Sequence, residues 1–160
     1  MSLRDDVEAG LREIDAPGSK APLVLNPRGA CVVTVPVPPQ VAQLTDGAML
    51  VQVQMGRTGR YFSLRSALAK LKETPDVALL EHLLVQQYYP DPIGGLGFAI
   101  SAEDDALVAT YHWIIDGIDP NSFAKLFSSF STAMFDVLAE IAKMARRDSS
   151  LEPVHPKAGL

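Results

Sequence analysis

The stretch LLEHLLVQQYYPDPIGGLGFAISAEDDALVATYHWII (residues 79–115) decides the fold, together with the amphipathic segment that follows it to Ala145. LLEHLLVQQYY has the apolar spacing of a helix, whereas LGFAIS and ALVATYHWII alternate as strands do. After Asp119-Pro120, a pair that suits a helix start, apolar residues recur at helical spacing to about residue 147. This order of helix, hairpin and helix contains no catalytic constellation. It favours a protein that works by contacting another protein.

The N-terminal segment predicts a short helix over residues 4–15. Val7, Leu11 and Ile14 recur at the spacing of one narrow apolar stripe, and acidic residues lie near the N-terminal end of the helix dipole. A helix with one narrow stripe docks by one face only. These three side chains are therefore candidates for contact with a partner, although each also fits a core position.

The segment between this helix and residue 75 predicts mostly strands. PLVLN (22–26) and ACVVTV (30–35) flank a Pro-Arg-Gly turn and predict a hairpin. AMLVQVQM (48–55) is the clearest strand, with one apolar face and one mixed face. SLRSALAKLKE (63–73) is compatible with a helix, although some of this region, especially residues 61–64, could instead be a strand.

The middle helix, predicted over residues 75–88, is apolar on opposite sides. Val77 and Leu84 belong to one stripe, whereas Leu79 and Leu83 point well away from Val77. A helix of this kind needs a cover on each side. We expect the sheet to cover one side and a second subunit to cover Leu79 and Leu83.

Composition and charge exclude several classes of protein. The chain has 160 residues and a formal net charge of −5, which argues against a nucleic-acid binder. No run of about 18 apolar residues is present, so no membrane span is predicted. The acidic N-terminus does not resemble a signal peptide, and the single Cys31 suits a reduced, buried position. We therefore expect a cytoplasmic protein.

Few side chains could carry chemistry. The three histidines have no metal-ligand spacing, so neither a metal nor another cofactor is predicted. Ser101, His112 and Asp104 form a catalytic set only on paper, because no GxSxG elbow is present. A small-molecule or enzymatic site around His112, Tyr111 and Trp113 stays open as an alternative.

Three parts of the chain together resemble the type III secretion chaperone superfamily and the related YbjN family. They are NPRGACVVTV (26–35), LLEHLLVQQYY with GGLGFAIS (79–101), and DDALVATYHWIIDGIDPNSFAKLFSSFSTAMFDVLAEI (104–141). The resemblance spans about residues 4–145. The expected fold is α+β, with an antiparallel five-stranded sheet and the order α-βββ-α-ββ-α. We expect one domain over residues 1–147 and a flexible tail over residues 148–160.

The resemblance also implies a non-enzymatic, acidic, cytoplasmic homodimer that binds a partner polypeptide through apolar patches. By position in the fold, the implied partner contacts are Val7, Leu11, Ile14, Val33, Val35, Leu50 and Gln52. The implied dimer contacts are Leu79, Leu80, Leu83 and Leu84. A YbjN-like regulator or adaptor that acts on a cytosolic partner is the alternative within the same resemblance.

Overall fold

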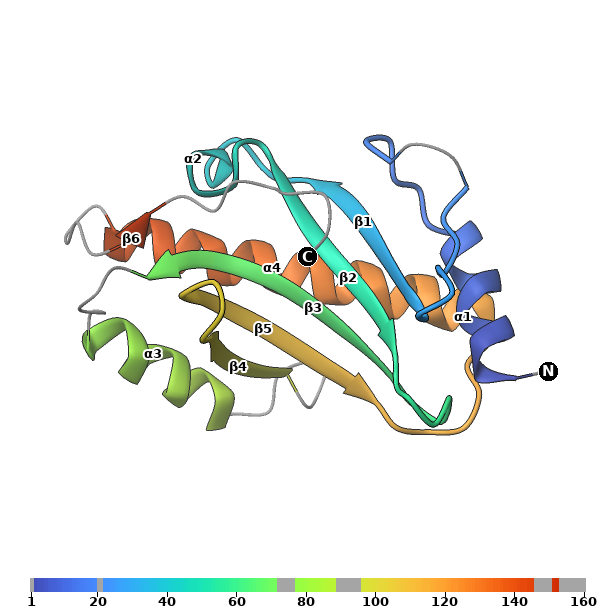
Figure 1. The fold of residues 1–160 in the computed structure, drawn as a ribbon. Coiled ribbons are helices and arrows are strands. Elements are labelled where there is room, and N and C mark those ends of the chain that lie inside the picture. The colour runs from blue at the N-terminus through green and yellow to red at the C-terminus, as the bar shows by residue number, and fades with distance from the viewer. Residues whose placement is uncertain (1, 20–21, 72–76, 89–95, 146–150, 153–160) are drawn as a thin grey trace.

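The computed structural model describes residues 2–19, 22–71, 77–88, 96–145 and 151–152. One antiparallel sheet forms the centre, and a long helix crosses one of its faces (Figure 1). The elements in chain order are α1 (Leu3–Arg12), β1 (Ala30–Pro36), α2 (Ala42–Thr45), β2 (Ala48–Met55), β3 (Phe62–Leu71), α3 (Val77–Tyr88), β4 (Leu96–Ser101), β5 (Ala106–Trp113), α4 (Pro120–Ala145) and β6 (Leu151–Glu152).

The strand order is β1-β2-β3-β5-β4, and every pair is antiparallel. The two-residue β6 adds a short pairing to the end of β3. The predicted α+β class, with a five-stranded antiparallel sheet and the order α-βββ-α-ββ-α, is confirmed; α2 and β6 are small additions. β1 and β4 are the two outer strands of this order, so β2, β3 and β5 are the interior strands on which the core is built.

The identity of one strand differs from the sequence prediction. Residues 22–26 do not form a strand, and residues 62–71, interpreted largely as a helix, form the central strand β3. The spacing of Leu64, Leu68 and Leu71 fits a helix, but β3 gains hydrogen-bonded neighbours on both sides, in β2 and β5. A register shift between Ala67 and Ala69 marks a bulge, and Leu68 and Ala69 are both fully buried there.

The hydrophobic core lies between the sheet and α4. Met49, Val51, Val53 and Met55 are buried on one face of β2, as the alternation predicts. The apolar stripe of α4 is buried at Phe123, Phe127, Phe130, Met134, Val137, Leu138 and Ile141. In Figure 1, α4 runs behind the sheet along most of its width. The opposite face of the sheet carries Gln52 and Gln54, both half-buried.

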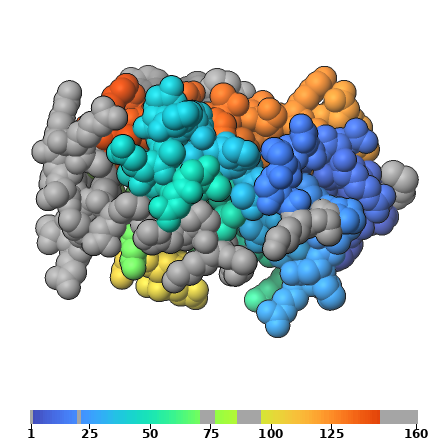
Figure 2. Space-filling model, turned by 90° about the horizontal axis from the view of Figure 1, so that it is seen from above, coloured from blue at the N-terminus to red at the C-terminus, as the bar shows by residue number. Residues whose placement is uncertain are grey.

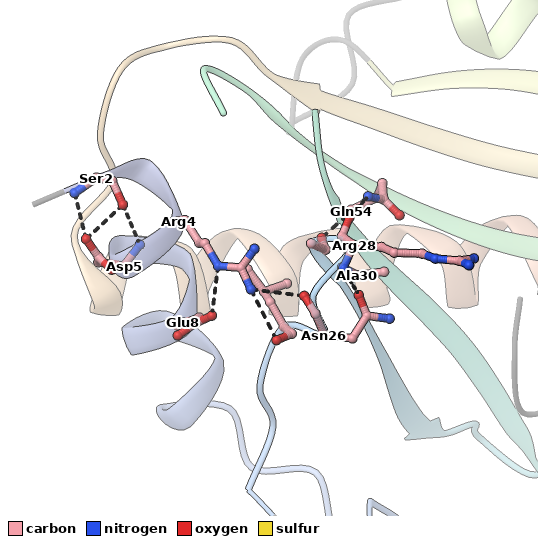
Figure 3. Close-up of polar contacts among 10 residues, drawn as sticks. Ser2, Arg4, Asp5, Glu8, Asn26, Arg28, Ala30 and Gln54 are labelled. Carbon is pink, nitrogen blue, oxygen red and sulfur yellow. Dashed lines mark hydrogen bonds and ion pairs between the residues drawn. The ribbon is translucent and has the colours of Figure 1, made fainter. Parts of the chain in front are cut away.

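Helix α1 is anchored at its start and along one side. The Ser2 hydroxyl accepts a hydrogen bond from the Asp5 backbone N–H, and the Asp5 carboxylate accepts one from the Ser2 N–H, which makes a capping box. The Arg4 guanidinium contacts Glu8 at 3.2 Å and donates to the Asn26 carbonyl at 2.9 Å (Figure 3). These contacts fix α1 to the turn that precedes β1.

Candidate interaction surfaces

The apolar stripe of α1 faces inward. Val7 and Leu11 are fully buried, because α1 packs against the first part of α4 (Figure 2). Gly10 permits this close approach, since a Cβ atom at Gly10 would lie 2.6 Å from the Cβ of Phe123. Ile14 lies beyond the helix end and is half-buried. The expectation that Val7 and Leu11 lie on the surface is therefore wrong, and the core alternative holds.

The sheet residues expected to contact a partner divide in the same way. Val33 and Leu50 are buried, whereas Val35 and Gln52 are half-buried. Val33 is paired with Val51 and belongs to the face under α4, so it contributes to the core. Of the predicted partner-binding set, only Ile14, Val35 and Gln52 keep part of their surface available, and their contact with a partner stays a prediction.

The middle helix α3 is apolar on opposite sides, but its orientation differs from the expected one. Leu79 and Leu83 are buried in the chain's own core, so they need no second subunit as a cover. Val77 and Leu84 are 67% and 66% exposed, and Leu80 is half-buried. The sequence shows two apolar sides; which side turns inward depends on how α3 rests against elements that are distant in sequence.

An exposed apolar surface therefore lies on the outer side of α3 and on the neighbouring strand β4. We call it the α3–β4 patch, and it consists of Val77, Leu80, Leu84, Val85 and Ile100. α3 contacts β4, and Figure 1 shows the two side by side at one end of the molecule. Within the described residues, β4 pairs only with β5, so it is an outer strand of the sheet.

Val85 and Ile100 were not among the expected interface residues. Val85 deviates from both stripes of α3, which was a usable signal, because a third apolar direction is hard to bury. Ile100 lies at a core-facing position of β4 by its pairing with Leu107, yet it is 51% exposed. Its exposure follows from the edge position of β4, which the sequence does not reveal.

The residues considered for chemistry do not converge. Tyr111 and Trp113 lie on the core face of β5, and His112 lies on the opposite face beside Ser63. Burial raises the pKa of the Tyr111 hydroxyl, and the Trp113 indole donates to the Gly117 carbonyl at 3.3 Å. Both rings therefore have structural roles, and the alternating directions of the three side chains do not form one site.

The three residues considered as a possible catalytic set, Ser101, His112 and Asp104, are also separated in space. The Ser101 hydroxyl donates to Asp104 at 3.5 Å, and Ser101 pairs with Ala106 at the start of β5. His112 lies six residues further along β5, a distance of about 20 Å at the rise of a strand. In the described ranges, no group of three His, Cys, Asp or Glu side chains could hold a metal ion. None of the helices in these ranges is long and apolar enough to cross a membrane.

Comparison with known proteins finds similarity at the level of fold. No family model and no curated protein sequence matches the chain. A chain of the HopA1–SchA chaperone–effector complex superposes with a TM-score of 0.56 at 16% identity, over 86% of this chain and 91% of that one. A chain of the ExsC–ExsE complex superposes with a TM-score of 0.52 at 14% identity, over 92% and 96%. The predicted fold-level resemblance to type III secretion chaperones is confirmed.

Proposed function

We propose that this chain, which shares its fold with type III secretion chaperones, is a non-enzymatic protein-binding module that acts as a homodimer. The observation that carries the dimer is the α3–β4 patch, a set of exposed apolar side chains on α3 and on the outer strand β4. Several exposed large apolar side chains on one side of a helix are typical of a surface that another protein covers. A second copy of the chain is the cover that we propose.

The charge pattern of α3 suits self-association. Between Val77 and Tyr88, Glu81 is the only acidic residue, and no Lys or Arg is present. A two-fold interface brings the same surface against itself, so a charged surface would meet its own charges there. Charged residues are depleted at the centres of protein interfaces for this reason and because of their desolvation cost.

The composition of β4, an outer strand of the sheet, supports the same surface. Natural edge strands are usually protected from pairing by Lys, Pro or inward-pointing charges. LGFAIS, the sequence of β4, contains no charged residue and no proline. An outer strand without these protective residues, next to an apolar helix face, is consistent with a surface that a second subunit covers in the functional protein.

Light scattering coupled to gel filtration tests the dimer. We expect a mass of twice the 17.2 kDa of the chain, and a monomer after Leu84→Glu. Burying one glutamate per subunit at the interface should weaken the dimer at least about 100-fold. Val24→Glu is the matched control, because Val24 is a half-exposed valine outside the patch. A monomer of the unmodified chain at about 100 μM would remove the dimer from the proposal, since such a dimer would be too weak to matter.

The second part of the proposal concerns binding of a partner polypeptide by those predicted contact residues that are not fully buried. Ile14, Val35 and Gln52 are the residues of that set which keep some exposure. Val35 and its neighbour Thr34 belong to β1, an outer strand of the sheet, and the Thr34 N–H contacts the Ser19 hydroxyl at 3.4 Å. Because the Ser19 hydroxyl already accepts from the Thr34 N–H, a partner segment here would contact the exposed part of Val35 and not this backbone group.

Affinity purification from the native host with mass spectrometry identifies the partner, and binding is then measured with both proteins purified. We expect Val35→Asp to weaken this binding at least about 10-fold and Val24→Asp to leave it unchanged. An unaltered affinity for Val35→Asp would place the partner elsewhere. A regulatory adaptor of the YbjN type would use the same surfaces and differ in the identity of the partner.

A further inference from the structure

A row of side chains crosses the face of the sheet that points away from α4, with one residue from each of the five main strands. Directly paired residues share a face of a sheet, and this row contains Gln52, which lies opposite the buried face of β2. Its members, in the order of the strands, are Val32, Gln52, Arg65, Thr110 and Gly97. All five are half-buried, and Arg65 is the central one. We call them the Arg65 row.

The described helices pack on the other face of the sheet. Buried apolar side chains of all four helices belong to one cluster with the core-facing side chains of the strands, and Figure 1 shows α4 behind the sheet. Ala67, Ala106 and Val108 form a separate cluster on the face of the Arg65 row. Ala67 follows Arg65 by two residues on β3 and is 8% exposed. Arg65 therefore borders a surface shielded from water, where an ionic contact is stronger than in bulk solvent.

Arg65 has no partner in the part of the chain that the structure describes. Its guanidinium takes part in neither ion pair and in no hydrogen bond there, and the side chains of Gln52 and Thr110 on either side of it also make no hydrogen bond. Thr45 is the one side chain in these ranges with a buried polar atom that lacks a partner, so the polar atoms of the three row residues are accessible to solvent. A half-buried guanidinium has lost part of its hydration, and its five N–H donors remain available to a ligand.

Arg65 is also the local source of charge on this face. The strand residues of the two neighbouring rows are Ala30, Gln54, Ser63 and His112 on one side and Thr34, Leu50, Ala67, Val108 and Ala99 on the other. None of these side chains can carry a negative charge.

The acidic residues nearest to the row along the strands are too distant to neutralise Arg65. Asp105 precedes Thr110 by five residues on the way into β5. Glu152 of β6 pairs with Lys70, which follows Arg65 by five residues. Five residues of strand span about 15 Å, which exceeds the Debye length of about 10 Å at 0.1 M salt. Among the described residues, the centre of this face therefore carries one positive charge without a counter-charge.

We propose that the Arg65 row binds a segment of the partner polypeptide in which a single Glu or Asp lies between uncharged residues. The carboxylate accepts two parallel hydrogen bonds from the Arg65 guanidinium, and the Gln52 amide and the Thr110 hydroxyl donate from either side. A phosphate group fits less well, because its charge of nearly −2 is commonly matched by several arginines. A strongly acidic segment is disfavoured by the net charge of −5 of the whole chain.

This inference deepens the proposed binding of a partner polypeptide and rests on it. It gives the predicted contact residue Gln52 a place beside the charged group of the ligand. It is independent of the dimer, because Ile100 of the α3–β4 patch pairs with the core-facing Leu107 and so lies on the other face of β4. A dimer through the α3–β4 patch and a segment on the Arg65 row can therefore be present together.

Calorimetric titration with the purified partner tests the role of Arg65. We expect Arg65→Gln to weaken binding at least about 10-fold and to reduce its dependence on salt. Arg60→Gln is the matched control and should bind like the original chain, because Arg60 is an exposed arginine in the turn before β3. Each Glu and Asp of the bound segment is then changed to its amide. One of these changes should weaken binding to the original chain at least about 10-fold and have little effect on binding to Arg65→Gln.

Thermal unfolding separates a binding role from a structural one. Arg65→Met removes the charge and keeps a long apolar stem, so the Tm should stay the same or rise, as is common when a residue kept for binding is replaced. A Tm lower by more than about 4 °C would show that the charge stabilises the chain itself, which overturns the inference.

A peptide probe decides the inference without the partner. The probe is the blocked peptide Thr-Val-Thr-Glu-Thr-Val-Thr, with a version in which Gln replaces Glu as control, and the Arg65 Nε–H signal is followed by NMR. We expect a saturable shift with a Kd below about 10 mM for the Glu peptide and at least about 10-fold weaker binding of the Gln peptide. Equal responses, no response, or tighter binding of inorganic phosphate would each overturn the inference.

Failure of this inference is distinct from failure of the proposed function. A partner that binds the original chain and Arg65→Gln equally well removes the Arg65 row and leaves the protein-binding module in place. A chain that binds no partner removes the proposed function, and the peptide result then shows whether the row recognises a carboxylate.

Discussion

Replacing Gly10 with alanine measures how closely α1 is docked on α4. A methyl group at Gly10 would lie 2.6 Å from the Cβ, Cγ and Cδ1 atoms of Phe123. Phe123 has little freedom to move away, because it is fully buried and its ring centroid lies 5.3 Å from that of Phe62. The added methyl group must therefore displace α1 or distort the packing of two aromatic rings.

Two opposing effects decide the sign of the change in stability. Alanine is a better helix former than glycine by about 1 kcal/mol in a helix interior, and by less near the last turn, where Gly10 lies. Overpacking a well-packed core costs about 1–3 kcal/mol. We expect the overpacking to dominate, with a net loss of about 1 kcal/mol in the free energy of unfolding. For a chain of this length the loss corresponds to a Tm lower by about 2–4 °C.

Urea denaturation and thermal unfolding measure the effect, and a double-mutant cycle with Phe123→Leu assigns it to this contact. The smaller side chain should make room for the methyl group, so the two substitutions together should cost less than the sum of each alone. A Gly10→Ala variant that is more stable than the original chain would refute the reasoning. It would show that helix propensity outweighs the contact and that α1 lies further from α4 than 2.6 Å implies.

Other consequences can be checked on the same purified protein. Leu79→Ala should lower the free energy of unfolding by about 2–5 kcal/mol, whereas Leu84→Ala in a monomeric background should change it by less than about 0.5 kcal/mol; equal losses in urea denaturation would contradict the assigned faces of α3. Hydrogen bonds from the side chain and backbone N–H of Ser122 lower the pKa of Asp119 from its ordinary value. The stabilising contribution of Asp119 is therefore complete above that ordinary value and is lost as the pH falls through the lowered pKa. Asp119→Asn should therefore show a smaller decline of Tm with acidification than the original chain, and an identical decline would exclude this contribution. Burial raises the pKa of the Cys31 thiol, so a thiol reagent at neutral pH should modify Cys31 slowly in the folded protein and quickly in urea; rapid modification without urea would show that β1 opens readily.

Periodicity predicted the elements that meet the core with one side only. The strand over residues 48–55 alternates between buried and mixed positions, and α4 places one continuous stripe on the sheet. In both cases the spacing of apolar residues in the sequence matches the pattern of buried side chains in the structure. The fold class and the order of elements followed from these segments and from the resemblance to the chaperone superfamily.

Elements whose conformation depends on distant neighbours were harder to predict. Residues 62–71 have helical spacing of leucine, but their place between β2 and β5 imposes an extended backbone. The inward side of α3 is set by how the helix rests against the core, and α1 docks through a glycine whose importance appears only beside Phe123. The candidate interfaces differ from the predicted ones for the same reason. An apolar residue indicates that it will be buried, but the sequence does not show whether the chain's own core or another subunit buries it.

The position of α4 in the chain has a consequence for synthesis on the ribosome. α4 covers the face of the sheet that holds Val33, Val51 and Leu64, yet it ends 145 − 71 = 74 residues after the end of β3. At about 5–20 residues per second, translation leaves the first three strands without this cover for about 4–15 s. Their apolar side chains are then open to wrong partners, including other nascent chains on the same message. The folding of these strands therefore concludes after α4 has left the ribosome, and the yield in a cell should depend on translation speed more than the final stability suggests.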